Sequence, residues 1–188
     1  YILRTAPVLM IFALVVLHCW LTMSYDSLLP DFAADALNGG ELEYNALIVC
    51  VGAGAMLASL GVAAIHRDAV RGRLFLISMV GSGLTPLLMS LAGHVIPAGA
   101  AAVSIGASQA VFMALSATLL QSVVPDGIRG RVMSIYFMLA AGVMSLQNLG
   151  GGILADQVGT PILFAIPGAA YAAIAWRSNT TPVAANPR

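Results

Sequence analysis

An uncharged run of 52 residues, from Leu74 to Pro125, constrains the fold of this chain more than any other feature. A second uncharged run of 24 residues, from Val132 to Ala155, follows after only six residues. A soluble domain carries about 25% charged residues, whereas this chain is 9% charged and 60% hydrophobic. Because a bilayer core about 30 Å thick takes roughly 20 apolar residues per helix, these runs predict an all-α integral membrane protein.

Charged and turn-forming residues divide the chain into six predicted membrane spans. The acidic stretch from Asp26 to Glu43, which contains Pro30 and Asn38-Gly39-Gly40, is expected to be the first outer loop. The spans are expected at about residues 5–25, 44–66, 74–91, 98–124, 132–155 and 162–176. They form one predicted membrane domain, residues 1–177. The polar tail, residues 178–188, is predicted to be disordered and cytoplasmic.

The arginines predict the orientation of these spans. With six spans, all eight Arg residues fall on one side of the membrane, and the opposite side holds six of the eight acids. Short loops rich in Arg stay on the cytoplasmic side. Both termini and the turns near residues 66–73 and 125–131 are therefore predicted to be cytoplasmic.

The charged turn at residues 125–131 joins the fourth and fifth predicted spans. Asp126 can pair with Arg129 across one helical turn, and an acid is favoured at a helix N-terminus. We therefore expect Asp126, Arg129 and Arg131 to hold the inner ends of two helices in place without contacting substrate.

Polar residues at membrane depth are the candidate transport site. His18, Thr22 and Asp26 are spaced four residues apart, so they share one face of a continuous helix. An ionisable group near the bilayer centre is costly and is by default a functional hypothesis. The alternatives are that a neutral His18 bonds to a neighbouring helix, and that Asp26 is the first residue of the outer loop.

Three amide side chains extend this candidate set. Gln109 lies in the middle of the fourth predicted span, and the adjacent Gln147 and Asn148 in the fifth must point to different faces. Two alternative roles are expected for these amides: hydrogen bonding between helices, or lining of a cavity. Neither cysteine has a His or Cys at ligand spacing, so no metal site or cofactor is expected.

Small residues in rows predict close helix packing. Gly54, Ala58 and Gly61 form one such row in the second span, and Gly106, Ala110 and Ala114 form another in the fourth. Gly150-Gly151-Gly152 indicates a flexing or closely packed segment in the fifth span.

An intramembrane serine protease is the enzyme class to weigh. Such proteases use a Ser in a G-x-S-G setting and a His on a later helix, but Gly106-Ala107-Ser108-Gln109 lacks the second Gly. His18, His66 and His94 all precede Ser108. Since no other nucleophile–base pair is evident in the sequence, the chain is not expected to be an enzyme. A nucleic-acid partner is not expected either.

Weak internal symmetry is also present. The L-x-x-L-G pattern occurs at residues 57–61 and again at 146–150, in the second and fifth spans. These positions are equivalent if the six helices form two inverted three-helix repeats, an arrangement typical of secondary transporters.

Four segments of the chain resemble the C-terminal half, helices seven to twelve, of a major facilitator superfamily transporter. They are most similar to the bacterial efflux branch that includes the enterobactin exporter, and the similarity spans most of residues 4–168. The segments are residues 28–33 (L-L-P-D-F-A), 52–57 (G-A-G-A-M-L), 121–134 (Q-S-V-V-P-D-G-I-R-G-R-V-M-S) and 151–156 (G-G-I-L-A-D). The segment around Arg129 is the most specific of the four.

The resemblance implies proton-coupled efflux of a small molecule, such as a drug or siderophore, by alternating access. It also implies the inner membrane of a bacterium, with the bilayer, protons and a six-helix N-terminal half as partners. Because those first six helices are not in this sequence, a truncated chain is expected in preference to a natural half-transporter. A membrane scaffold or subunit that transports nothing remains the alternative function.

Overall fold

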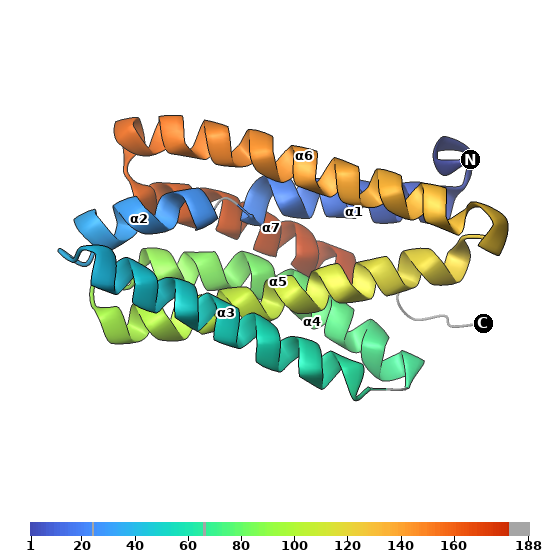
Figure 1. The fold of residues 1–188 in the computed structure, drawn as a ribbon, viewed down its shortest axis with the longest axis horizontal. Helices are drawn as coiled ribbons and strands as arrows, with labels where there is room; N and C mark the ends of the chain where they lie inside the picture. The colour runs from blue at the N-terminus through green and yellow to red at the C-terminus, as the bar shows by residue number, and fades with distance from the viewer. Residues whose placement is uncertain (24, 66, 181–188) are drawn as a thin grey trace.

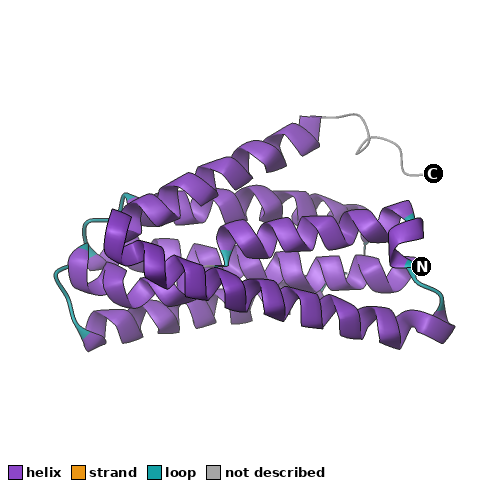
Figure 2. Cartoon of the chain, turned by 90° about the horizontal axis from the view of Figure 1, so that it is seen from above, coloured by secondary structure: helices purple, strands orange, loops and turns teal. Residues whose placement is uncertain are grey.

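The computed structural model describes residues 1–23, 25–65 and 67–180, and every regular element in these residues is helical. A short 3-10 helix, η1 (Ile2–Arg4), precedes α1 (Ala6–Thr22). The remaining helices are α2 (Tyr25–Asp35), α3 (Glu41–Ala63), α4 (Asp68–Ser90), α5 (Val95–Val123), α6 (Asp126–Val158) and α7 (Thr160–Thr180). Figures 1 and 2 show the long helices lying roughly side by side, joined by short loops.

Five segments among the described residues are helical, long and apolar enough to cross a membrane. They are Ala6–Asp35, Glu41–Ala63, Val70–Ser90, Val95–Val123 and Asp126–Gly151. Thr160–Ile174 is a shorter apolar segment, but α7 continues to Thr180, and its 21 residues extend about 31 Å at 1.5 Å per residue. The predicted all-α membrane fold is confirmed, whereas the inverted repeats stay a prediction.

The acidic stretch after the first span is helical, so the prediction of a loop there is wrong for Asp26, Asp31 and Asp35. All three lie on α2, which also contains Pro30. This stretch is helical because it has an apolar face, although Pro30 and the acids are typical of a turn. Leu28, Leu29, Phe32 and Ala33 repeat at helical spacing, and all four are buried in one core cluster.

The charged segments also differ from the prediction. Helix α4 begins at Asp68, so Arg71 and Arg73 lie on its first turns. Helix α6 begins at Asp126, so Arg129 and Arg131 are also helical. His66 lies outside the described residues. The predicted disordered tail overlaps the end of α7 at residues 178–180, and its remainder, 181–188, is also outside the described residues.

Glycines bring α3 into close contact with α5. A Cβ atom at Gly54 would overlap the carbonyl oxygen of Val103, and one at Gly106 would overlap the carbonyl oxygen of Val51. The close packing predicted around Gly54 and Gly106 is therefore present, while Gly61 faces open space. A second pair of helices, α4 and α7, also packs closely, because Gly83 of α4 lies against α7. The sequence did not single out this glycine.

The order of the helices follows from these contacts. In Figure 1, α6 and the α1–α2 pair lie on one side of α7, and α3, α4 and α5 lie on the other. Helix α5 packs against α3 and α4, and α7 packs against α4. The turn between α6 and α7 is a single residue, Gly159, whose φ of 80° favours glycine. Polar residues on α1, α5 and α7 can consequently meet inside the bundle.

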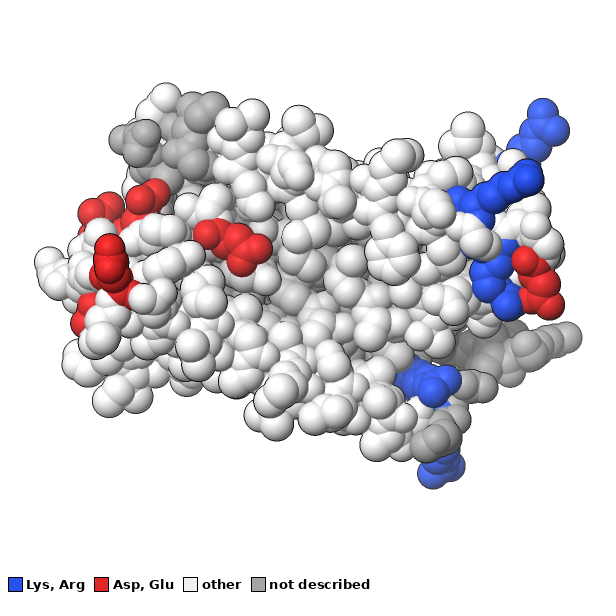
Figure 3. All heavy atoms as spheres, viewed as in Figure 1, with Lys and Arg blue, Asp and Glu red and all other residues white. Residues whose placement is uncertain are grey.

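Charges separate toward the two ends of the bundle. Figure 3 shows the arginines at the end that holds the N-terminus and the α5–α6 turn. The acids lie mostly at the opposite end, where α2 leads into α3. Asp126, which begins α6 and pairs with Arg129, belongs to the basic end. This separation agrees with the charge pattern from which the orientation was predicted.

Candidate functional site

His18 lies at the centre of a buried polar network that joins three helices. Its Nδ1 atom is 2.9 Å from the hydroxyl oxygen of Tyr171 on α7. Its Nε2 atom is 2.5 Å from Oε1 of Gln109 on α5. His18 and Tyr171 are fully buried, and Gln109 is 4% exposed. Residues far apart in the sequence therefore form one enclosed site inside the bundle.

The contacts define a direction for each hydrogen bond. Nε2 of Gln109 donates to the carbonyl oxygen of Thr22 at 3.1 Å, so Oε1 of Gln109 faces His18 as an acceptor. Nε2–H of a neutral His18 then donates to Gln109, and Nδ1 accepts from the hydroxyl of Tyr171. On protonation, Nδ1 would become a donor, and the Tyr171 hydroxyl can rotate to accept. The hydrogen-bonding pattern alone thus permits either protonation state of the ring.

Aromatic rings enclose the imidazole. The ring of Phe112 is stacked on His18 with centroids 3.6 Å apart, and the ring of Phe75 is stacked on Phe112 with centroids 5.2 Å apart. Tyr171 meets the imidazole edge-on at 5.3 Å. These contacts fix the orientation of the ring, so that both nitrogens point at their hydrogen-bonding partners.

The predicted row of His18, Thr22 and Asp26 is only partly present. The hydroxyl of Thr22 donates to the backbone carbonyl oxygen of His18 at 2.8 Å and not to the imidazole. Helix α1 ends at Thr22, and Asp26 is an exposed residue in the first turn of α2. Because the helix is interrupted between them, the spacing of four residues does not extend the face to Asp26.

Gln147 lines a cavity between α1, α2, α6 and α7. The cavity has a volume of about 230 Å³, and its walls are mainly apolar. Its lining residues are Trp20, Leu21, Leu28, Leu146, Gln147, Gly150, Gly151, Leu154, Leu163 and Pro167. A small amphipathic molecule fits such a lining, because one amide and one indole can bind polar groups while the rest contacts hydrocarbon.

The glycine segment of α6 belongs to this cavity. Helix α6 runs unbroken from Asp126 to Val158, and a Cβ atom at Gly150 would meet open space. Gly150 therefore leaves room in the cavity wall. The adjacent Asn148 is half-buried, and its Oδ1 atom has no hydrogen-bonding partner within the described part of the chain.

The charged turn forms a separate group at the basic end. Arg129 pairs with Asp126, and its Nη2 atom donates to the carbonyl oxygen of Val124 at 3.3 Å, across the α5–α6 turn. Arg131 is exposed. Neither arginine lines the cavity that contains Gln147.

Sequence analysis missed Tyr171 and Phe112. Both lie in apolar runs, where an aromatic residue alone gives no indication of a polar contact. The phenolic hydroxyl of Tyr171 was the available signal, since a buried Tyr usually finds a hydrogen-bonding partner. Among the residues that the structure describes, no group of three His, Cys, Asp or Glu side chains could hold a metal ion.

A bundle of membrane-spanning helices with a buried polar network and a mainly apolar cavity is typical of integral membrane transporters. The sequence profile of a family described as transmembrane secretion effector matches residues 4–184. The chain belongs to this family of major facilitator superfamily transporters. No match was found among curated proteins or among solved structures.

Proposed function

We propose that the chain is part of a proton-coupled exporter that moves small amphipathic molecules, such as drugs or siderophores, by alternating access. Membership of the secretion-effector family supports a role in efflux in general. The observation that carries the finer proposal is the His18–Gln109–Tyr171 network, because it is a titratable group held by hydrogen bonds inside a membrane bundle.

The network and the cavity share two helices. Trp20 and Leu21 line the cavity two and three residues after His18 on α1. On α7, Pro167 lines the cavity one helical turn before Tyr171. A change in the bond between His18 and Tyr171 would therefore act on two of the four helices that border the cavity. This arrangement supports coupling between proton binding and the shape of the substrate site.

The proposed setting is the inner membrane of a bacterium, with both termini in the cytoplasm. The arginines at one end of the bundle support this orientation. A further six-helix half is the proposed partner, because alternating access requires a second bundle that moves against this one. Under this proposal Gln147 contacts substrate, whereas a substrate role of Asn148, which does not line this cavity, stays a prediction. His18 carries the proton, Gln109 and Thr22 hold the imidazole in place, and Asp26 lies at the outer mouth.

The proposal is tested by measuring dye accumulation in bacterial cells that express the full-length protein. We expect expression to lower the accumulation of an amphipathic dye, and an uncoupler to restore it, since the proton gradient would drive export. A non-transporting scaffold would leave accumulation unchanged with or without the uncoupler. Export that persists after the gradient has collapsed would contradict proton coupling while keeping the transport role.

A further inference from the structure

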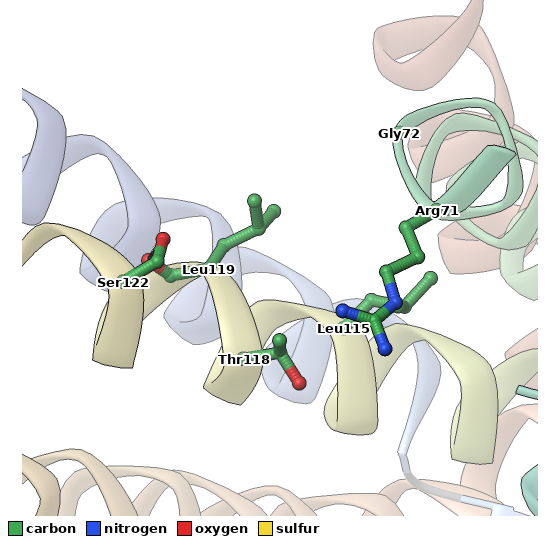
Figure 4. A pocket seen from close by; sticks show the side chains of 6 residues that line it. All are labelled: Arg71, Gly72, Leu115, Thr118, Leu119 and Ser122. Atoms are coloured by element: carbon green, nitrogen blue, oxygen red, sulfur yellow. Dashed lines mark hydrogen bonds between the residues drawn. The ribbon is translucent and has the colours of Figure 1, made fainter. Parts of the chain in front are cut away.

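A second cavity lies at the basic end of the bundle, between α4 and α5, away from the proposed transport site. Its volume is about 230 Å³, and it is lined by Arg71, Gly72, Leu115, Thr118, Leu119 and Ser122. Figure 4 shows the side chain of Arg71 extending from α4 toward α5, which contributes the other side chains. The cavity therefore combines a guanidinium, two hydroxyls and two leucines.

The polar groups of this cavity suit a phosphate. Nε of Arg71 donates to the carbonyl oxygen of Ile65 at 2.9 Å, which holds the guanidinium in place. A guanidinium has five N–H groups in a fork that matches an oxyanion, so a phosphate can bind Arg71 in addition to the partners that it already has. The hydroxyls of Thr118 and Ser122 donate to backbone carbonyls of α5, each at 2.8 Å, and can rotate toward a ligand.

The placement of the cavity along α5 matches a membrane lipid. Ser122 is one residue from the end of α5, at the level of the membrane surface. Leu115 lies eight residues before Val123, about 12 Å deeper along the helix at 1.5 Å per residue. Thr118 and Leu119 are exposed on the outside of the bundle, where lipid would surround it. The residue of this lining nearest the end of α5, Ser122, is polar, and the deepest, Leu115, is apolar, which matches the order of headgroup and acyl chain in a phospholipid.

The charge around the cavity favours an anionic lipid. Arg67 and Arg73 are exposed beside Arg71 at the start of α4. Basic groups at the ends of membrane helices attract anionic headgroups. We propose that this cavity binds an anionic phospholipid of the adjoining leaflet, with its phosphate on Arg71 and the two hydroxyls. The first carbons of its acyl chains lie against Leu115, which is deeper along α5 than both hydroxyls. This proposal does not depend on proton-coupled export.

The test is a titration of the purified full-length protein with phosphatidylglycerol and phosphatidylcholine, followed by native mass spectrometry. The wild-type protein should bind phosphatidylglycerol more tightly than phosphatidylcholine. Arg71→Gln should weaken phosphatidylglycerol binding about tenfold, because a charge-assisted pair is lost. The matched control is Arg73→Gln, which removes the same charge at the same end outside the cavity and should change the affinity less than about twofold.

Thr118→Val tests the site without altering Arg71. It keeps the shape of the side chain and should weaken phosphatidylglycerol binding about threefold, through the loss of one hydroxyl. If Arg71→Gln does not fold, the phosphatidylglycerol affinity of Thr118→Val tests the proposed site by itself. Equal losses in Arg71→Gln and Arg73→Gln would show diffuse attraction to the basic end and overturn the proposal. Unchanged affinity in Thr118→Val, or displacement of the lipid by an equal concentration of inorganic phosphate, would overturn it too.

Discussion

Nε2 of His18 on α1 lies 2.5 Å from Oε1 of Gln109 on α5, although 91 residues separate them in the sequence. The amide of Gln109 is itself fixed by its bond to the carbonyl oxygen of Thr22. Tyr171 completes the set from α7. Because both nitrogens of the imidazole have partners, the loss of any one partner leaves a polar group unpaired inside the membrane, where water cannot replace it.

Tyr171→Phe should change both stability and pH dependence. It removes the hydroxyl that contacts Nδ1 of His18, and we expect a loss of about 1–3 kcal/mol in the free energy of unfolding, because a buried acceptor is left unsatisfied. Efflux measured from about pH 5 to about pH 8 should also follow a different profile, since His18 loses the group that responds to its protonation.

Tyr136→Phe is the matched control for this variant. The Tyr136 hydroxyl lies 2.8 Å from the hydroxyl of Ser116, so its removal should also lower stability. It does not contact His18, so the pH profile should be that of the wild-type protein. If both variants changed the pH profile in the same way, the effect would come from general loosening of the bundle and not from the His18 network.

Gly54→Ala should separate α3 from α5. The new methyl group would overlap the carbonyl oxygen of Val103, and an overpacked interior costs about 1–3 kcal/mol or more. Gly52→Ala, on the same helix, places its methyl group in open space and should leave the melting temperature almost unchanged. Thermal unfolding of both variants in the same detergent checks this difference. Equal melting temperatures would show that α3 and α5 do not pack closely at Gly54.

The positions of the helices could be predicted from the sequence better than the contacts between them. His18 and Gln109 stood out because a polar residue in an uncharged apolar run is costly. Their contact with each other could not be predicted, because it depends on how α1 packs on α5. Tyr171 was missed because a Tyr in an apolar run is usually interpreted as a core packing residue. For Asp26, Pro30 and the nearby acids indicated a loop, and the burial of Leu28 and Phe32 that stabilises α2 is a tertiary effect.

Arg129→Ala should reduce transport of all substrates by a similar factor. Arg129 pairs with Asp126 and donates to the carbonyl oxygen of Val124, so it links the end of α5 to the start of α6. Arg131→Ala removes the same charge from an exposed position and should have a smaller effect. Efflux rates for several chemically different dyes test this expectation. A change in substrate preference alone would contradict the structural role.

Reporter fusions test the proposed orientation. Fusions after Asp35 and after Asp156 should report an external location, because these positions follow the first and fifth spans. Fusions after Asp68 and after Gly127 lie at the basic end and should report a cytoplasmic location. An external signal after Gly127 would contradict the six-span topology and the orientation together.

The most direct test of proton coupling is proton movement in vesicles that contain the full-length protein, measured with a pH-sensitive dye in the lumen. His18→Gln keeps a side chain that can donate and accept hydrogen bonds but cannot titrate. His18→Leu leaves Oε1 of Gln109 and the hydroxyl of Tyr171 without their His18 partner and should cost about 1–3 kcal/mol of stability. We predict that substrate-driven proton movement is present in the wild-type protein and absent in a folded His18→Gln variant. Proton movement with an unchanged pH profile in His18→Gln, lost only in His18→Leu, would show that His18 is a structural hydrogen-bonding residue.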